Sequence, residues 1–371
     1  MKKVLTILLV IILFFSVSSI TVNAEESFLY DLSDLYNSLS DEAKQSLDNI
    51  GANEADASLL SNISFSSIIN EILNIASNNI SSPFKGLISI SAILLICSLL
   101  SAYKNSLSND VSNAINIVST LCITSAVALP AISVINNASA VINIASNIML
   151  AYIPVMVVMM SSSGHMISSG SYYATMIATG EGIAQLSSKV IIPFLNMFLG
   201  ISITSSVSPE INLSGFTNMI SKTVKWLLGF SMAIFTTVLS LKQIINTSLD
   251  SVSSKAVKFA LSSFVPIVGS ALSDAYKTVQ GSIGVMKSGV GVFVILSIVV
   301  VFLPVIIQTL LWITTLWLGK SMADVLSLSQ TSKLIECVSV VFSTLLAVTL
   351  CIMSIYIIST ALVLVIGGGG A

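Results

Sequence analysis

Three polar side chains are evenly spaced within an otherwise apolar part of the chain. Glu181, Gln185 and Lys189 lie four residues apart, so an α-helix would place them on one face, where the amide could bridge the carboxylate and the ammonium. A charge at the centre of a membrane helix costs about 2.5–3.5 kcal/mol, so such residues need a reason to be there. We interpret them as a polar patch on a conduit or as a contact between subunits. The alternative is that Glu181 and Lys189 lie at the membrane surface and extend into water.

A second group of candidates surrounds a predicted interruption of a helix. Pro266 removes a backbone donor and Gly269 loosens the helix, so residues 257–276 are expected to form either a re-entrant hairpin or a broken span. Asp274 and Lys277 follow at a spacing of three, and this pair could face a water-filled cavity or form an ion pair at the surface. All four residues join the candidates for a conduit or a subunit contact.

The remaining reactive residue types do not combine into a catalytic or metal site. His165 is the single histidine and lies in a Ser-rich segment at 161–165, so we interpret it as an isolated loop residue. The four cysteines lie in apolar runs without a Cys-x-x-Cys pair. Residues 319–321 (Gly-Lys-Ser) resemble the end of a phosphate-binding loop, but Thr314 stands where that motif needs Gly. We expect no enzyme activity, no ATPase within this chain, no metal and no cofactor.

The composition indicates that these residues belong to a membrane protein. Of 371 residues, 54% are hydrophobic and 9% are charged, and the mean hydropathy is +0.97, whereas soluble domains carry about 25% charged residues. The net charge of −2 gives no electrostatic footprint for nucleic acid. We predict an all-α polytopic protein with seven or eight transmembrane helices, the number depending on whether residues 257–276 cross the bilayer. The spans are expected near 86–103, 115–135, 139–160, 183–206, 225–245, 289–317 and 337–366.

The first 83 residues differ from the rest of the chain. Residues 1–24 read as a secretory signal peptide, with two lysines before an apolar stretch and Ala24 at its end, although a retained first membrane helix is the alternative. Residues 25–83 hold ten of the 17 acids and should form a small extracytoplasmic helical segment, including a helix at 41–50 stopped by Gly51. This segment either docks a partner or packs as a cap on the membrane domain, which we assign to residues 84–371.

A weak internal repeat relates residues 84–206 to residues 224–366. Each half opens with a lysine before a span and continues through a Ser-rich or Asn-rich joint to a proline, Pro130 or Pro266. Repeats of this kind are common in transport folds. The pattern therefore leaves open a second function, that of a self-contained secondary transporter of a small solute.

One stretch of the chain resembles a known family. Residues 256–260 (Ala-Val-Lys-Phe-Ala) lead into a Phe-x-Pro-x-x-Gly core at 264–269, which is followed by Ser-Asp-Ala at 273–275 and a Gly-Val-rich span that reaches Pro304. With the signal peptide and the acidic segment, these motifs resemble the stage III sporulation protein AE family of endospore-forming bacteria. The resemblance extends over roughly residues 60–366.

The resemblance implies a place in the apparatus that links mother cell and forespore. Family members sit in the mother-cell-derived membrane around the forespore, and the N-terminal segment would face the intermembrane space. The implied partners are the lipid bilayer, the other stage III A proteins (the AA ATPase, AB, AC, AD, AF, AG and AH) and the forespore protein Q. We therefore expect a non-enzymatic subunit of a transenvelope secretion or feeding channel, needed for endospore formation and late forespore gene expression.

Overall fold

A computed structural model of the protein describes residue 37 and residues 39–52, 64–102, 109–177, 182–207, 214–264 and 269–368. Every secondary-structure element in these ranges is a helix. The predicted signal peptide, residues 1–24, lies outside the described residues. The expected all-α class is confirmed.

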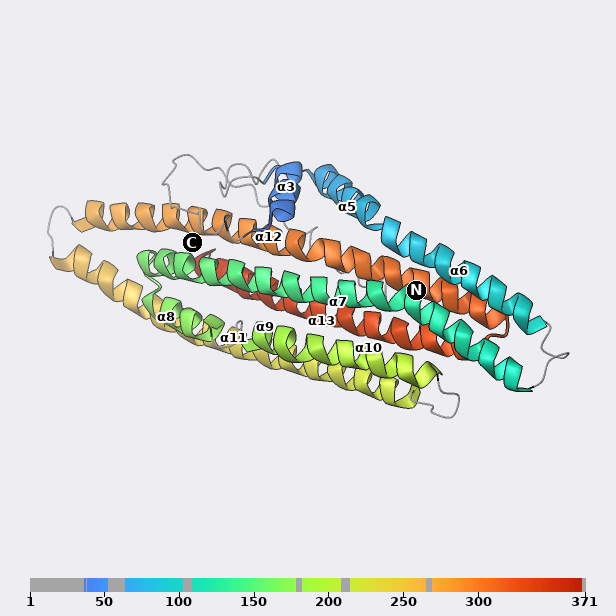
Figure 1. The fold of residues 1–371 in the computed structure, drawn as a ribbon. Helices are drawn as coiled ribbons and strands as arrows, with labels where there is room; N and C mark the ends of the chain where they lie inside the picture. The colour runs from blue at the N-terminus through green and yellow to red at the C-terminus, as the bar shows by residue number, and fades with distance from the viewer. Residues whose placement is uncertain are drawn as a thin grey trace.

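Among the described residues, six passes of helix, each reversing the direction of the one before, form an elongated bundle (Figure 1). The third pass is assembled from short pieces, α8, α9, a π-helix and α10, whereas each of the other passes is a single long helix. The helices are α6 (Ser81–Ala102), α7 (Asn109–Ser162), α8 (Met166–Thr175), α9 (Gly182–Leu186), the π-helix Ser187–Ile191, α10 (Ile192–Val207), α11 (Ser214–Phe264), α12 (Gly269–Val325) and α13 (Ser329–Gly368).

Six helices among the described residues are long and apolar enough to cross a membrane, rather than the seven or eight that we predicted. The difference arises in α7. The sequence predicted separate spans at 115–135 and 139–160, but the helix continues without interruption through the Asn-Asn-Ala joint between them. At 1.5 Å per residue its 54 residues extend over about 81 Å, and a hydrocarbon core is only about 30 Å thick. Part of α7 therefore extends beyond the hydrocarbon layer.

The centre of the bundle is the antiparallel pair α12 and α13. In their most apolar stretches 67% and 61% of the residues are buried inside the protein, against 17% for α11. Trp312 of α12 and Phe342 of α13 stack across this pair, with ring centroids 5.9 Å apart. Both rings are almost fully buried. Dispersion contacts of such rings are a large part of what holds the passes together.

The acidic N-terminal segment packs on the membrane domain. α3 (Asp41–Ile50) begins where the hydroxyl of Ser40 accepts the Ala43 N–H and ends at Gly51, whose φ of +82° is left-handed, as the sequence predicted. α3 rests on α12 and on α5 (Phe65–Asn79). The amide of Asn49 donates to the carboxylate of Glu71 at 2.8 Å, which ties α3 to α5. α3 is thus packed against α12 and α5, while Asp41, Glu42 and Asp48 are exposed.

Leu47 should control whether α3 stays attached. Its side chain is fully buried, so Leu47→Ala removes apolar contact and leaves a cavity, with an expected cost of about 2–4 kcal/mol. In a chain whose native cysteines are replaced by alanine, a buried Ser46→Cys reporter should then react faster with a membrane-impermeant maleimide. Leu73→Ala is the matched control, because Leu73 is 61% exposed. Equal labelling in the two variants would show that Leu47 does not anchor α3.

Candidate functional site

A concentration of polar contacts lies where α7, α8 and α11 meet. α7 ends in a Schellman turn: the N–H of Gly164 donates to Ser161 O at 3.0 Å, and the N–H of His165 donates to Met160 O at 2.9 Å. Gly164 has a φ of +85°, which glycine adopts without strain. α8 begins directly afterwards, with His165 as the residue before its first turn.

Asp250 of α11 closes the start of α8. Its Oδ1 accepts the backbone N–H of Ile167 at 3.0 Å and its Oδ2 accepts that of Ser168 at 3.1 Å. These are N–H groups that a helix start leaves without an intrahelical partner, and the residue at the cap position, His165, provides no side-chain bond to them. Asp250 is 1% exposed, and a buried carboxylate is tolerated only when charge-assisted bonds replace its hydration. The carboxylate therefore accepts the hydrogen bonds that the first turn of α8 would otherwise lack, and these bonds replace the water that the buried carboxylate has lost.

His165 lies beside the same carboxylate, with Nδ1 3.7 Å from Oδ2 of Asp250. His165 lies in the connection between α7 and α8, as predicted, but it is not isolated there. The sequence could not reveal the contact, because the two residues are 85 positions apart and are brought together only when α11 packs along α8.

Lys242 of α11 completes the arrangement at the other end of α8. Its Nζ donates to Oγ1 of Thr175, the last residue of the helix, at 2.9 Å. An acid at a helix start and a cation at a helix end both interact favourably with the helix dipole. α11 thus presents Asp250 and Lys242, eight residues apart, to the two ends of α8 that favour their charges.

α8 buries its polar face and exposes apolar side chains. Ser168, Ser169, Tyr172 and Thr175 are buried, whereas Met166 is 73% exposed. The Tyr172 hydroxyl has no hydrogen-bond partner among the described residues. This inversion suits a helix whose outer surface meets lipid or another protein while its inner surface binds α11. We define Asp250, Lys242, His165 and α8 as the α8 clasp.

Asp250 and its contacts were missed by sequence reasoning. One feature of the sequence could have pointed to Asp250. It is the single acid between Glu210 and Asp274 and follows closely after an apolar span, where burying a carboxylate is costly. An ionisable residue in that setting requires a partner. Its partners are backbone N–H groups, however, and every residue except proline has one, so a sequence pattern cannot identify which of them Asp250 binds.

The structure describes two of the three residues of the predicted polar face, so the face of Glu181, Gln185 and Lys189 stays a prediction. Gln185 and Lys189 are exposed, and Glu181 lies outside the described residues. The prediction assumed an unbroken α-helix, but a π-helix occupies Ser187–Ile191, and its wider turn changes the angular spacing of the side chains. The polar contact that the structure shows here is between the hydroxyls of Ser139 and Ser188, 3.3 Å apart.

The predicted interruption near Pro266 separates two long helices. α11 ends at Phe264 and α12 begins at Gly269, and the two run in opposite directions (Figure 1). Residues 257–264 thus form the end of α11 and residues 269–276 the start of α12. Pro266 lies outside the described residues, as do the side chains of Asp274 and Lys277, whose backbones belong to α12. Their proposed role in a conduit stays a prediction.

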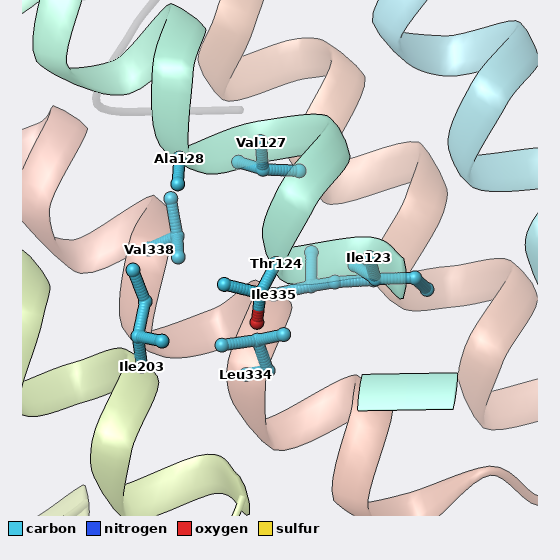
Figure 2. Close-up of a pocket in the computed structure, with 8 residues that line it drawn as sticks. All are labelled: Ile123, Thr124, Val127, Ala128, Ile203, Leu334, Ile335 and Val338. Carbon is cyan, nitrogen blue, oxygen red and sulfur yellow. The ribbon is translucent and has the colours of Figure 1, made fainter. Parts of the chain in front are cut away.

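Side chains of α7, α10 and α13 converge on a shallow apolar hollow that is too small to hold a water molecule (Figure 2). Its walls are aliphatic apart from the hydroxyl of Thr124, which has no hydrogen-bond partner among the described residues. The lining residues are Ile123, Thr124, Val127, Ala128, Ile203, Leu334, Ile335 and Val338.

The six apolar passes and their polar contacts between helices define a polytopic α-helical membrane protein. The family model for stage III sporulation protein AE matches residues 56–367, and the chain belongs to that family, as the motifs at 256–304 predicted. A protein named stage III sporulation protein AE from Bacillus subtilis (strain 168) is 22% identical over 144 residues, which cover 39% of this chain and 36% of that relative. The match thus covers about a third of the relative's length. No solved structure matches the chain.

Proposed function

We propose that the chain is a non-enzymatic membrane subunit of the channel that joins mother cell and forespore, needed for endospore formation and late forespore gene expression. Membership of the stage III sporulation protein AE family over residues 56–367 carries the proposal and connects the chain with sporulation. The six-pass bundle supports it, because a subunit of such a channel must lie within a membrane.

The proposed partners are the other stage III A proteins (the AA ATPase, AB, AC, AD, AF, AG and AH) and the forespore protein Q. The acidic side of α3 supports a contact on the N-terminal side, since Asp41, Glu42 and Asp48 are exposed on a helix that α12 and α5 hold in place. Energy would come from the separate ATPase. The Gly-Lys-Ser of residues 319–321 lies within the helix α12 and not in a phosphate-binding loop.

The proposed location is the mother-cell-derived membrane around the forespore, with the N-terminal segment facing the intermembrane space. Six passes would then return the end of α13 to the same side as that segment. The residues around the α11–α12 turn, Asp274 and Lys277, remain the proposed conduit residues together with Glu181.

Removing the chain should abolish most heat-resistant spores and silence a late forespore reporter, and the unaltered chain should restore both. In the restored strain we expect Asp274→Ala to lower reporter output at normal protein level, because a conduit would lose its carboxylate. Asp48→Ala, on the outer side of α3, tests partner docking separately from conduction. Normal spores and reporter activity without the chain would contradict the proposed function.

The rival function, a self-contained secondary transporter, makes a different prediction. The purified chain alone in vesicles would move a small solute without partners. The proposed subunit should show no flux alone, whereas solute movement by the isolated chain would favour the transporter and the repeat of residues 84–206 and 224–366.

A further inference from the structure

One face of α7 is left uncovered by the described part of the chain, and its middle is polar. Exposed residues follow one another at alternating spacings of four and three along this face, which we call the α7 seam. The opposite face of the same turns is buried in the core, as Ile135, Ile142 and Ile148 show. The seam consists of Leu129, Ser133, Asn136, Ala140, Asn143, Asn147, Leu150 and Pro154.

The polar part of the seam cannot avoid the bilayer. The apolar stretch of α7 is residues 117–162, and only 16 residues (117–132) precede Ser133 while 15 residues (148–162) follow Asn147. A crossing needs about 20 residues. Any crossing placed within this stretch therefore brings at least two of the four polar seam residues into the hydrocarbon.

Asparagine amides in hydrocarbon need partners, because no water is present to bind them. None of the described residues is shown bonding to the side chains of Asn136, Asn143 and Asn147, and all three are exposed. Polar side chains of this kind join membrane helices by hydrogen bonds across the contact, and a small residue such as Ala140 lets the helices approach closely. The seam thus has the properties of a helix–helix interface.

The pattern of the seam indicates which helix would cover it. Alternating spacings of three and four are those of a left-handed coiled coil, in which each position meets its own counterpart in a parallel pair. Two copies inserted in the same membrane with the same orientation present parallel α7 helices. An amide both donates and accepts, so a row of asparagines is complementary to itself, and no charged residue on the seam calls for an oppositely charged partner.

We propose that the α7 seam is the surface through which two copies of this chain associate in the membrane, with Asn136, Asn143 and Asn147 each bonding to the same residue of the other copy. Leu129 and Leu150 pack at the two ends of the polar stretch. The proposal does not depend on what the protein transports or on its role in sporulation, so the two can fail separately.

Cysteine cross-linking in native membranes tests the contact. Cys122 lies one heptad before Leu129, so all four native cysteines are first replaced by alanine. In that chain Asn143→Cys and the less disturbing Ala140→Cys should give a covalent dimer at twice the monomer mass on mild oxidation, because a disulfide forms only when the Cα atoms come within about 7 Å. Ile234→Cys, 48% exposed within the apolar stretch of α11, should stay monomeric.

A second measurement uses two differently tagged copies in one cell. Asn143→Leu combined with Asn147→Leu should reduce co-purification several-fold, whereas Asn137→Leu, beside the seam, should leave it nearly unchanged. The proposal is overturned if neither seam cysteine forms a dimer while the protein is present, if Ile234→Cys cross-links equally, or if the seam cysteines attach only to a different protein.

Discussion

Asp250→Ala should detach α8 from α11 and lower the stability of the bundle by about 2–4 kcal/mol. The substitution leaves the backbone N–H groups of Ile167 and Ser168 without their acceptors, and an unsatisfied buried donor costs about 1–3 kcal/mol. It also removes the negative charge from the start of α8. The readouts are the unfolding temperature in detergent and the reaction of a Ser169→Cys reporter, which is 3% exposed in the intact clasp.

Asp250→Asn is the matched control, because it keeps the size of the side chain and one of the two acceptor oxygens. It should lose about half as much stability as Asp250→Ala. Lys242→Ala should cost less than either, since Lys242 is exposed and its bond to Thr175 is that of a surface cation. If Ser169→Cys stays as protected in the alanine variant as in the unaltered chain, Asp250 does not hold α8.

The parts of the fold that sequence predicted correctly depend on neighbouring residues. α3 occupies Asp41–Ile50 as predicted, because the Ser40 hydroxyl caps its first turn and the left-handed Gly51 follows its last. α11 ends at Phe264 and α12 begins at Gly269, inside the stretch 257–276 where the sequence predicted an interruption. Apolar content alone then predicts that the remaining helices are embedded in a membrane.

The errors occurred where contacts between distant segments decide the structure. The Asn136–Asn137 joint lowers the hydropathy and imitates a loop between two spans, but Val134, Ile135 and Ala138 on the inner face of the same turns are buried in the core. That packing keeps α7 continuous. The α8 clasp was missed for a related reason, since its carboxylate binds backbone atoms more than 80 residues away.

The contact of α6 with α12 gives the second large effect. The two helices run in the same direction (Figure 1). Gly86 of α6 lies against Trp312 of α12, and one turn further along α6, Ile90 lies against Gly319 of α12. Thr315 adds a hydrogen bond to Pro83 O at 3.3 Å. Trp312 is fully buried, so the ring occupies the space that a side chain at position 86 would need.

Gly86→Ala should therefore destabilise the protein by about 1–3 kcal/mol, the cost of overpacking a filled core. The new methyl carbon would lie 2.5 Å from Cη2 and 2.9 Å from Cζ3 of Trp312. The ring cannot swing aside cheaply, because it is stacked on Phe342 at 5.9 Å. Gly200→Ala on α10 is the matched control: nothing lies within 4 Å of its added carbon, so the better helix propensity of alanine should leave stability unchanged or raise it by up to about 1 kcal/mol.

A double-mutant cycle separates the clash with Trp312 from a general intolerance at position 86. Trp312→Leu alone should cost about 2–4 kcal/mol, because it removes the stacked ring and leaves a cavity. That cavity provides room for the methyl group of Gly86→Ala, so the second substitution should cost little in the Trp312→Leu chain and the two losses should not add. Strictly additive losses in the detergent unfolding temperature would mean that the ring is not what excludes a side chain at position 86, and that α6 is held against α12 by other contacts.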